Sequence, residues 1–370
     1  MIAGADSSPL TQRKLIFITG ASRSGTTLLS FVLRNHHEVC GLRELQYFGE
    51  AWDPRTGERR CTRARAIAAV ARMLARQEHG ILTASISAAQ RQAATTLIEG
   101  LGVAATDPAA VFAATAHALA RAAGKSIPCE QTPRYIFYAR ALLDIYPAAQ
   151  VVHLVRDPRA VMASQKMRWR RRQLAADGAA VPRYQSLRVW VNYHPYTVAR
   201  LWSQATAAAL ALATHPRVTL VRFEDLVQKP EDTVRGLCSR LGLDFDMRML
   251  DVGQINSSHQ SASGGARRGL HATAIDKWRE VLTSTEIAIA ERSCGRSMDR
   301  FGYARSASAV PSLAAELGQR LSYLAHLGGV ALVNPRRAYV QAKALLRVRA
   351  QPHTAADGDG TAAAHGDPPG

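Results

Sequence analysis

The sequence lacks long hydrophobic runs, a basic leader and a regular cysteine pattern. No apolar stretch approaches the ~18 residues that a membrane-spanning helix needs, so an integral membrane protein is not expected. Residues 1–10 carry no basic side chain, and the apolar run at 15–18 is too short for a signal peptide. The five cysteines are odd in number and have no CxxC spacing, which argues against a disulfide framework and a structural zinc site. We therefore expect a cytoplasmic protein without a bound metal.

Acidic and aromatic residues are also scarce. Asp and Glu number 29 against 47 Lys and Arg, for a formal net charge of +18, and aromatic residues make up 6% of the chain. A basic excess of this size favours anionic partners, such as nucleic acid, a membrane surface or a polyanionic small molecule. Hydrophobic residues make up 47% of the 370 positions, which is ordinary for a globular protein.

Three short apolar runs predict the strands of an α/β fold. They cover residues 14–19, 150–155 and 218–222, and a segment with helical spacing of apolar residues follows each of them. The first of these helices is expected to end near 35–37. Strand and helix in alternation predict a parallel β-sheet flanked by helices. An alanine-rich stretch predicts a helical insertion at about 62–125.

The predicted organisation is one large domain with extensions at both ends. Residues 1–12 are expected to form a flexible N-terminus and residues 13–304 the α/β domain. A basic helical extension is predicted at 305–350. The last segment, 351–370, consists largely of Ala, Gly, Asp, His and Pro, and a disordered tail is expected there.

A glycine-bracketed loop joins the first predicted strand to the first predicted helix. It reads Gly20-Ala-Ser-Arg-Ser-Gly-Thr-Thr27, and the backbone N–H groups of such a loop form a phosphate cradle with the helix N-terminus. The frame is that of a Walker A motif, but Thr26 stands where lysine is expected, and Arg23 supplies a cation instead. The missing lysine disfavours an ordinary ATP or GTP hydrolase. The alternative is a glycine turn that only connects the two elements.

A second motif begins where the second predicted strand ends. Arg156 is followed by Asp157-Pro158, which starts a helix in the usual way, and Ser164 lies eight residues after Arg156. Arg156 and Ser164 would therefore project from the strand end and the helix toward one anion. The alternative is a capping Asp-Pro pair beside a surface arginine.

Both motifs resemble those of sulfotransferases that use 3′-phosphoadenylyl sulfate (PAPS), in the bacterial, carbohydrate and protein-tyrosine branch. The loop of that family reads [P/G]-x-[R/K]-S-G-T-T, which residues 21–27 resemble in the arginine form, with Ala21 at the first position. The resemblance implies that this loop holds the 5′-phosphosulfate of PAPS. The loop residues that would do so are Arg23, Ser24, Gly25, Thr26 and Thr27.

The resemblance also extends to the other side of the nucleotide. It implies that Arg156 and Ser164 bind the 3′-phosphate, and that Phe223, in Val221-Arg-Phe-Glu-Asp-Leu226, lies near the adenine where relatives have tyrosine. The alternative for Phe223 is a core residue at a strand end. By its position before Trp278, Arg268 would close over the 3′-phosphate, unless it is simply solvated.

Sulfuryl transfer resembles phosphoryl transfer, with in-line attack and charge gathering on the leaving oxygen. Arg23 and the loop amides would stabilise that charge without a metal, and a base must take the proton of the acceptor. Resemblance to the protein-tyrosine enzymes points to Glu44, 21 residues after Arg23. The alternative is a surface glutamate paired with Arg43 or with a neighbouring residue. Histidine is the base in many cytosolic relatives. The histidines that could serve instead are His36, His37 and His153, the last of which is better explained as a core residue.

One position departs from the family pattern. Many relatives have lysine in a Glu-Lys-Thr-Pro segment where this chain has Gln131, so Arg134 or Lys125 would have to supply the cation. The basic run Lys166–Arg172 would contact an acidic acceptor or anionic lipid, or it is a solvated helix end.

Together these features predict transfer of a sulfuryl group from PAPS to a hydroxyl or amine of a carbohydrate, lipid or other small acceptor. Peripheral membrane contact through the basic segments stays open, whereas no nucleic-acid module is visible and no nucleic-acid partner is expected. Two other classes stay open. One is a kinase-like ATP-dependent phosphotransferase, and the other is a basic nucleic-acid or membrane-binding protein with a degenerate nucleotide site. The sequence does not determine the acceptor or the oligomeric state.

Overall fold

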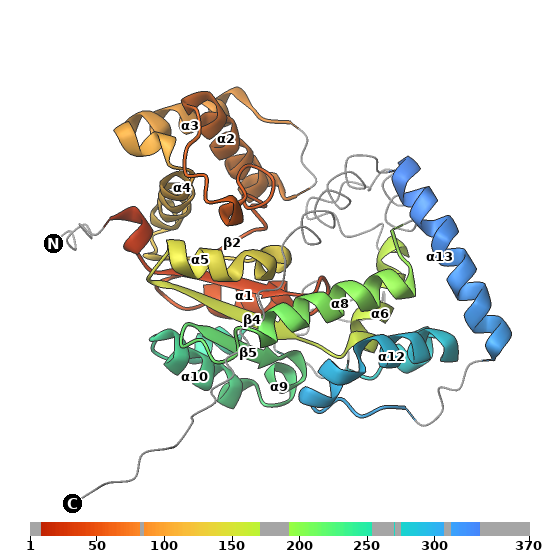
Figure 1. Ribbon diagram of the computed structural model, residues 1–370. Coiled ribbons are helices and arrows are strands. Elements are labelled where there is room, and N and C mark those ends of the chain that lie inside the picture. Colours follow the sequence, from red (N-terminus) through yellow and green to blue (C-terminus); the bar gives the residue numbers. More distant parts are fainter. Residues whose placement is uncertain are drawn as a thin grey trace, which may run out of the picture.

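A computed structural model describes residues 9–81, 85–170, 192–253, 270, 275–306 and 312–333. These residues form a five-stranded sheet in the order β2-β3-β1-β4-β5, in which every neighbouring pair is parallel (Figure 1). The strands are β1 (Leu15–Gly20), β2 (Val39–Leu42), β3 (Ile127–Glu130), β4 (Ala149–Val155) and β5 (Val218–Arg222). The predicted class, a parallel sheet flanked by helices, is confirmed.

Strands β2 and β3 are the two that the apolar pattern did not predict. Each has four residues, and Gly41 in β2 and Pro128 in β3 lower the intrinsic preference for strand. Pairing decides their conformation, because Val39 to Leu42 align in register with Ile127 to Glu130 and β3 in turn pairs with β1. Neighbouring strands therefore make these segments extended where composition does not.

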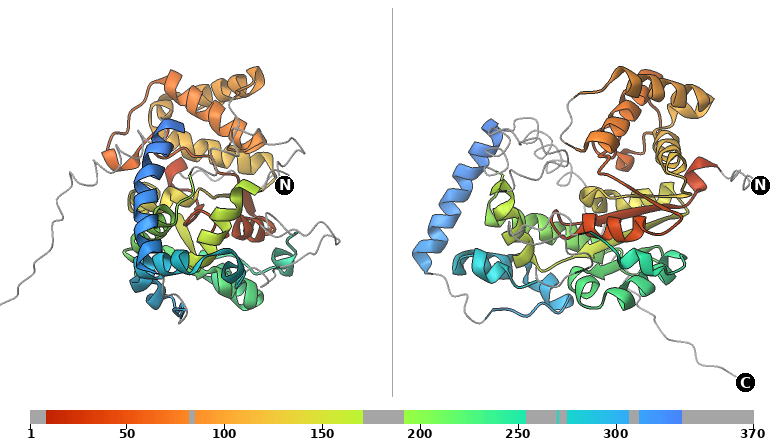
Figure 2. Two further views of the ribbon diagram at one scale, coloured as in Figure 1. Left: turned by 90° about the vertical axis from the view of Figure 1, so that its right-hand side faces the viewer. Right: turned by 180° about the vertical axis from the view of Figure 1, so that it is seen from behind.

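The central strand β1 separates two hydrophobic cores. Leu15 and Phe17 face a core on one side of the sheet, and Ile16 and Ile18 face a second core on the other side. This alternation follows from the two-residue repeat of a strand. All four side chains are at most 2% exposed, and burial of each contributes roughly 1.5–3 kcal/mol to stability. Covering both faces requires helices above and below the sheet, as Figures 1 and 2 show.

The helices begin where the sequence supplies caps. Thr283 and Ser87 form capping boxes, and the side chains of Thr62, Asp107 and Asp157 accept first-turn N–H groups. The helices are α1 (Thr26–Arg34), α2 (Arg63–His79), α3 (Ala88–Gly100), α4 (Pro108–Ala122), α5 (Ala139–Ile145), α6 (Pro158–Lys166), α8 (Pro195–Leu210), α9 (Phe223–Gln228), α10 (Pro230–Leu241), α11 (Trp278–Val281), α12 (Ser284–Arg300) and α13 (Leu313–Val333).

The alanine-rich stretch contains α2, α3 and α4, which lie together on one side of the sheet (Figure 1). They share a small core of their own, with Val70, Ala94, Ile98 and Val111 buried. One face of α4 also packs on the main core through Phe112, so this helix ties the insertion to the sheet. At the start of the chain, Leu10–Gln12, in the segment expected to be flexible, form a short 3₁₀ helix.

Candidate active site

The carboxyl ends of parallel strands meet at one edge of the sheet, and ligands of such folds bind at that edge. Strand β1 lies at the switch point, because the chain continues from it to β2 and β3 on one side and later to β4 and β5 on the other. The loop 21–25 and the segments that contain Glu44, Gln131, Arg156 and Phe223 all follow carboxyl ends. The topology therefore gathers the predicted site residues at this edge.

The loop between β1 and α1 has the backbone of an anion cradle. Arg23 has φ +80° and Gly25 has φ +99°, and such left-handed residues between right-handed ones turn successive N–H groups toward a common centre. The N–H of Ser24 donates to the carbonyl of Ala21 at 3.0 Å, while the Oγ of Ser24 is buried without a hydrogen-bond partner. A non-glycine residue held at positive φ is typical of functional loops. An anion with oxygens at the loop would satisfy the Ser24 hydroxyl.

Gly25 is required by conformation and by space. An added Cβ would lie 2.5 Å from Cδ2 of the buried Phe223 ring, closer than van der Waals contact allows. We expect Gly25→Ala to destabilise the fold by more than the ~1–2 kcal/mol that a left-handed alanine costs, because overpacking adds roughly 1–3 kcal/mol. Urea unfolding measures this. Gly57→Ala is the control, since Gly57 has φ +71° and nothing within 4 Å of its Cβ position; equal losses in the two variants would contradict the predicted clash.

The two sequence motifs meet at the loop. Nε of Arg23 donates to Oγ of Ser164 at 3.2 Å, and Nη1 of Arg156 donates to the carbonyl of Arg23 at 3.3 Å. These residues lie 141 and 133 positions apart in the chain. The structure thus brings Arg23, Arg156 and Ser164 into one constellation. The sequence analysis placed Arg156 and Ser164 together but did not predict their contacts with Arg23, and the binding roles of all three stay predictions.

Arg156 is held in a buried setting. Its guanidinium lies 4.3 Å from the centre of the Phe223 ring, and its carbonyl accepts from Nε1 of Trp202 at 2.8 Å. Burial lowers the pKa of Arg156, and the charges of Glu224 and Asp157 oppose that effect. Phe223 belongs to the core beneath the loop, with its ring against Gly25 and Arg156. Its packing therefore matches the alternative that the sequence left open, and a contact with a base stays a prediction.

A buried ionic network supports this constellation, and the sequence analysis did not predict it. Arg159 contacts the carboxylate of Asp157 through Nε and Nη2, donates to Oε1 of Glu291 at 2.7 Å, and lies 4.2 Å from the centre of the Trp278 ring. Through these contacts α12 and α11 fix the start of α6, which carries Ser164. The available signal was the second arginine of Arg156-Asp-Pro-Arg159, three residues after the first.

Glu224 connects the same region to the end of the domain. Its Oε1 accepts from the N–H of Asp157 at 3.0 Å, and its Oε2 accepts from the hydroxyl of Tyr303 at 2.7 Å. Because Asp157 follows Arg156 directly, Glu224 fixes the backbone that presents Arg156. Burial, with the neighbouring Glu224 charge, raises the pKa of Tyr303, so the tyrosine stays a neutral hydrogen-bond donor.

Glu44 follows β2 at the same edge. Its Oε2 accepts from Nε2 of Gln46 at 2.9 Å, and Gln46 has φ +54°. Burial raises the pKa of Glu44, whereas the positive charges of Arg168, Arg134 and Arg23 lower it in part. A partly desolvated carboxylate in the field of the loop arginine is suited to take a proton. The hydrogen-bond partner of the Glu44 side chain is the neighbouring Gln46 rather than Arg43. This contact fits the alternative of pairing with a neighbour, and the role of Glu44 as a base stays a prediction.

Glu130, at the end of β3, is a second buried carboxyl at this edge. It accepts hydrogen bonds from the N–H groups of Leu45 and Thr132 at 2.9 Å and from the hydroxyl of Thr132. It thereby holds the segment after β2 against β3. Burial outweighs these donors and raises the pKa of Glu130 to about 8.

This shift predicts a pH dependence of stability. The Glu130 carboxyl stays protonated in the folded state up to about pH 8 but ionises near its ordinary pKa in the unfolded chain. Unfolding therefore releases a proton in that window, and the unfolding free energy of the wild type should fall by up to about 1.4 kcal/mol per pH unit as pH rises. Glu130→Gln should remove this slope above pH 6.5, and Glu50→Gln, at an exposed site, should keep it. Equal slopes in urea unfolding of all three proteins would refute the shift.

Gln131, at the position of the missing lysine, and the two basic residues considered in its place lie in different parts of the fold. Gln131 is buried, and its Oε1 has no hydrogen-bond partner. Arg134 donates to the carbonyl of Phe48 at 3.2 Å and to Glu50 at 3.4 Å. Lys125 precedes β3 and donates to the carbonyls of His36 and Val39 at 2.9 Å, at the amino edge of the sheet. Lys125 therefore lies away from the loop, and a cationic role of Arg134 in place of the missing lysine stays a prediction.

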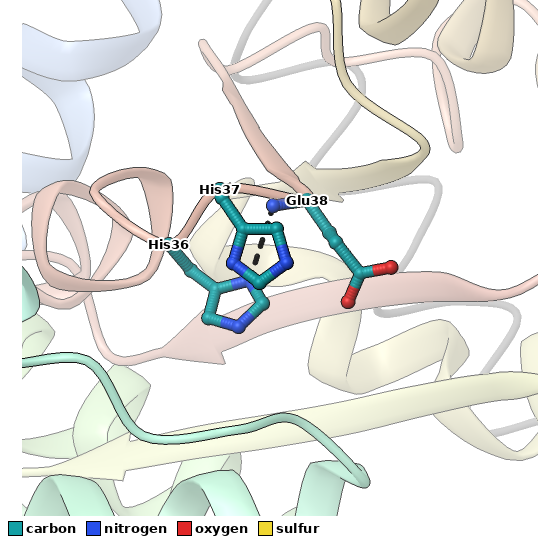
Figure 3. A group of neighbouring side chains, drawn as sticks. All are labelled: His36, His37 and Glu38. Atoms are coloured by element: carbon teal, nitrogen blue, oxygen red, sulfur yellow. Dashed lines mark hydrogen bonds between the residues drawn. The ribbon is translucent and has the colours of Figure 1, made fainter.

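The histidines do not lie at the loop. His153 lies inside β4, bonded to Oγ1 of Thr19 at 3.0 Å, and burial lowers its pKa to about 3, so it is a core residue. His36 and His37 follow the end of α1 at the opposite edge (Figure 3). With Glu38 they form a cluster whose side-chain ligand atoms lie within 4.8 Å of one another. Nδ1 of His36 already accepts from the N–H of Glu38 at 3.2 Å, and we assign the cluster no metal.

Several predictions fall partly or wholly outside the described residues. Arg268, the last two residues of the basic run and the tail 351–370 lie outside them, as do parts of the predicted N-terminus 1–12 and of the predicted extension 305–350. Within that run, Lys166 donates to Oε2 of Glu286 at 2.7 Å and to the carbonyl of Val281 at 3.1 Å. Lys166 therefore joins α6 to α12, which is a structural role for the first residue of the run.

The glycine loop lies at the switch point of a parallel sheet and contacts Arg156 and Ser164 of the second motif. This arrangement is typical of α/β proteins whose ligands carry anionic groups. The sulfotransferase family matches residues 16–247. That match covers more than half of the chain, and the chain belongs to the sulfotransferase family.

Individual relatives match over shorter regions. Mouse carbohydrate sulfotransferase 5 is 31% identical over 170 residues, which are 42% of this chain and 41% of that protein. Nodulation protein NoeE of Sinorhizobium fredii is 27% identical over 292 residues, or 76% and 63% of the two chains. The Mycobacterium tuberculosis omega-hydroxy-beta-dihydromenaquinone-9 sulfotransferase Stf3 is 26% identical over 176 residues, or 47% and 41%. The chain thus spans about two fifths to three fifths of the length of these relatives.

Solved structures give similar matches. The sulfotransferase domain of a Synechococcus olefin synthase aligns with a TM-score of 0.49 and 20% identity over 79% of this chain and 95% of that one. Mouse sulfotransferase SULT7A1, solved in complex with PAP, aligns with a TM-score of 0.39 and 9% identity over 79% and 89%.

Proposed function

We propose that the protein is a PAPS-dependent sulfotransferase that transfers a sulfuryl group to a hydroxyl or amine of a small acceptor. The observation that carries this proposal is the contact of Arg23 with Ser164 at 3.2 Å, together with the bond from Arg156 to the Arg23 carbonyl. It couples a cradle for one phosphate group to a second arginine–serine pair. Two linked anion sites suit a nucleotide with phosphate at both ends of its ribose.

The chain fits such a nucleotide at both sites. The unpartnered hydroxyl of buried Ser24 and the left-handed conformations of Arg23 and Gly25 suit a cradle for an anion. The residues that would hold the 5′-phosphosulfate are Arg23, Ser24, Gly25, Thr26 and Thr27. Arg156 and Ser164 would hold the 3′-phosphate, with Arg268 as a further ligand and Phe223 beneath the site. PAPS supplies the activated sulfuryl group.

In this proposal the protein has two chemical tasks, which are to stabilise negative charge and to take a proton from the acceptor. Arg23 and the loop N–H groups would stabilise negative charge at the phosphate end of the site. Glu44 would take the proton of the acceptor, since it lies in the field of Arg23 and is bonded on one oxygen only by Gln46. The raised pKa of Glu44 makes it a stronger base than an exposed glutamate. Gln46 would hold the carboxylate in place.

The acceptor class is proposed from the relatives. Their names include carbohydrate sulfotransferases and a menaquinone sulfotransferase, so sugar hydroxyls and lipid alcohols are the first to screen. The helices α2–α4 follow β2 and stand beside the Glu44 segment, and they would shape the acceptor side of a domain covering 13–304. All five cysteines are unpaired, which suits the proposed cytoplasmic location.

A metal-free thermal-shift titration tests the donor. At a hundred times its Kd, 3′,5′-bisphosphoadenosine should stabilise the fold by about 2.7 kcal/mol, and ATP with Mg²⁺ should have a much smaller effect. Stabilisation by Mg-ATP alone would instead support the kinase-like phosphotransferase. If neither ligand stabilises the fold and DNA or anionic vesicles bind in a salt-sensitive way, the basic binding protein with a degenerate nucleotide site replaces the proposal.

A further inference from the structure

Helix α13 presents leucines to solvent. The leucines of its outer face recur at intervals of three or four residues, with one more near the end, and this spacing places them on one side of an α-helix. They are between 48% and 86% exposed. They are Leu313, Leu317, Leu321, Leu324, Leu327 and Leu332.

The opposite face of α13 is polar and packs on the protein. Oγ of Ser322 lies 3.1 Å from Nε2 of His194, and Nε2 of His326 lies 3.2 Å from Oγ1 of Thr197. The ring of Tyr323 lies 5.0 Å from that of His194. A salt bridge joins Glu316 to Arg292 of α12. These contacts hold the helix beside α8 along the outside of the molecule (Figure 2).

The helix is therefore inverted relative to an ordinary surface helix, which turns its apolar face inward. Single exposed leucines are common, but a continuous apolar stripe marks an interaction surface. The polar contacts with His194, Thr197 and Arg292 decide which face of the helix points inward and therefore which face carries the exposed leucines. A set of exposed leucines on one helix face therefore indicates an apolar partner.

The chain beyond α13 indicates which partner. Residues 334–350 contain five basic residues and no acidic residue. The basic residues are Arg336, Arg337, Lys343, Arg347 and Arg349. A leucine face followed at once by a cationic segment matches a bilayer with anionic headgroups, which takes apolar side chains below the headgroups and attracts basic ones above them. No helix among the described residues is long and apolar enough to cross a membrane.

We propose that α13 is a peripheral membrane anchor whose leucine face lies in the surface of an anionic bilayer. The contacts described for α13 are with His194, Thr197 and Arg292, which have no part in the proposed nucleotide site, so this proposal does not depend on the identity of the nucleotide. The anchor would hold the enzyme at a membrane surface.

Flotation of the full-length protein with lipid vesicles tests the anchor. Vesicles of phosphatidylcholine mixed with phosphatidylglycerol should carry the wild type, and vesicles of phosphatidylcholine alone should carry less of it. Leu321→Glu/Leu324→Glu should weaken binding roughly tenfold or more, because it places charge in the apolar face. The matched control is Val103→Glu/Met247→Glu, which adds the same charges at exposed apolar positions outside α13 and should bind like the wild type. Arg336→Glu/Arg337→Glu should reduce only the preference for anionic vesicles.

Three outcomes would overturn the proposal. The first is a wild type that binds neither vesicle. The second is equal loss of binding in the α13 variant and its control. The third is a wild type that is dimeric by light scattering without lipid and a leucine variant that is monomeric, with no vesicle binding by either; a second copy of the chain would then cover the leucines. Thermal unfolding of each variant verifies that the fold is intact.

Discussion

Glu44→Gln is expected to lower kcat by about two to four orders of magnitude while leaving the affinity for 3′,5′-bisphosphoadenosine unchanged. Glutamine keeps an oxygen that can accept the 2.9 Å hydrogen bond from Gln46, so the segment after β2 should keep its shape. It cannot take a proton from the acceptor. The measurement is transfer of labelled sulfate from PAPS to the best acceptor in the screen, with nucleotide affinity measured separately.

The matched control for this variant is Glu50→Gln. Glu50 lies in the same connection, exposed, and pairs with Arg76 at 2.7 Å and Arg134 at 3.4 Å. Its substitution should change kcat by less than about twofold, as for most surface charges. Wild-type turnover by Glu44→Gln would remove Glu44 as the base. In the wild type, the raised pKa of Glu44 should place the acid limb of kcat/KM above the ordinary range of glutamate, with activity falling as the pH is lowered through it.

Arg156→Ala is expected to weaken binding of 3′,5′-bisphosphoadenosine about a hundredfold. The variant would lose two charge-assisted hydrogen bonds to the 3′-phosphate, each worth roughly 1.5–3 kcal/mol of binding free energy. Water that takes the place of the guanidinium would compensate part of this loss. Isothermal titration measures the loss. Adenosine 5′-phosphate, which lacks the 3′-phosphate, should bind Arg156→Ala and the wild type with similar affinity if Arg156 acts on that group.

Arg235→Ala is the control for the general effect of removing an arginine that stacks on a phenylalanine ring. Arg235 also stacks on a phenylalanine, 4.0 Å from the centre of the Phe245 ring, but on the surface of α10. Its removal should leave nucleotide affinity unchanged. If Arg156→Ala also binds the bisphosphate normally and unfolds like the wild type, the 3′-phosphate does not lie at Arg156, and the assignment of Ser164 falls with it.

The sequence was most informative where local chemistry and chain order coincide. The glycine loop lies between a buried strand and a helix, and the structure has β1 and α1 at those positions. Asp157-Pro158 predicted a helix start, and α6 begins at Pro158 with the Asp157 side chain as its cap. Such features depend on residues close together in the chain, so they can be read without the fold.

Other features depend on contacts between distant segments and could not be predicted in this way. Strands β2 and β3 are extended because they pair with each other and with β1. The position of Lys125 at the amino edge follows from the sheet order, and the coupling of Arg159 to Glu291 joins residues 132 positions apart. The inverted packing of α13 likewise depends on which face its neighbours α8 and α12 contact.

By itself, the sequence determined the glycine loop between β1 and α1, the helix start at Asp157-Pro158 and the α/β class, because turn chemistry, capping and hydrophobic periodicity are properties of short segments. Only the tertiary structure decided which of the candidate residues share one site. Arg23, Arg156 and Ser164 contact one another. The positive charge of Arg23 lowers the pKa of Glu44 in part. His36 and Lys125, in contrast, lie at the amino edge of the sheet. The physical reason is that a parallel sheet brings the carboxyl ends of strands together regardless of how far apart they are in the chain.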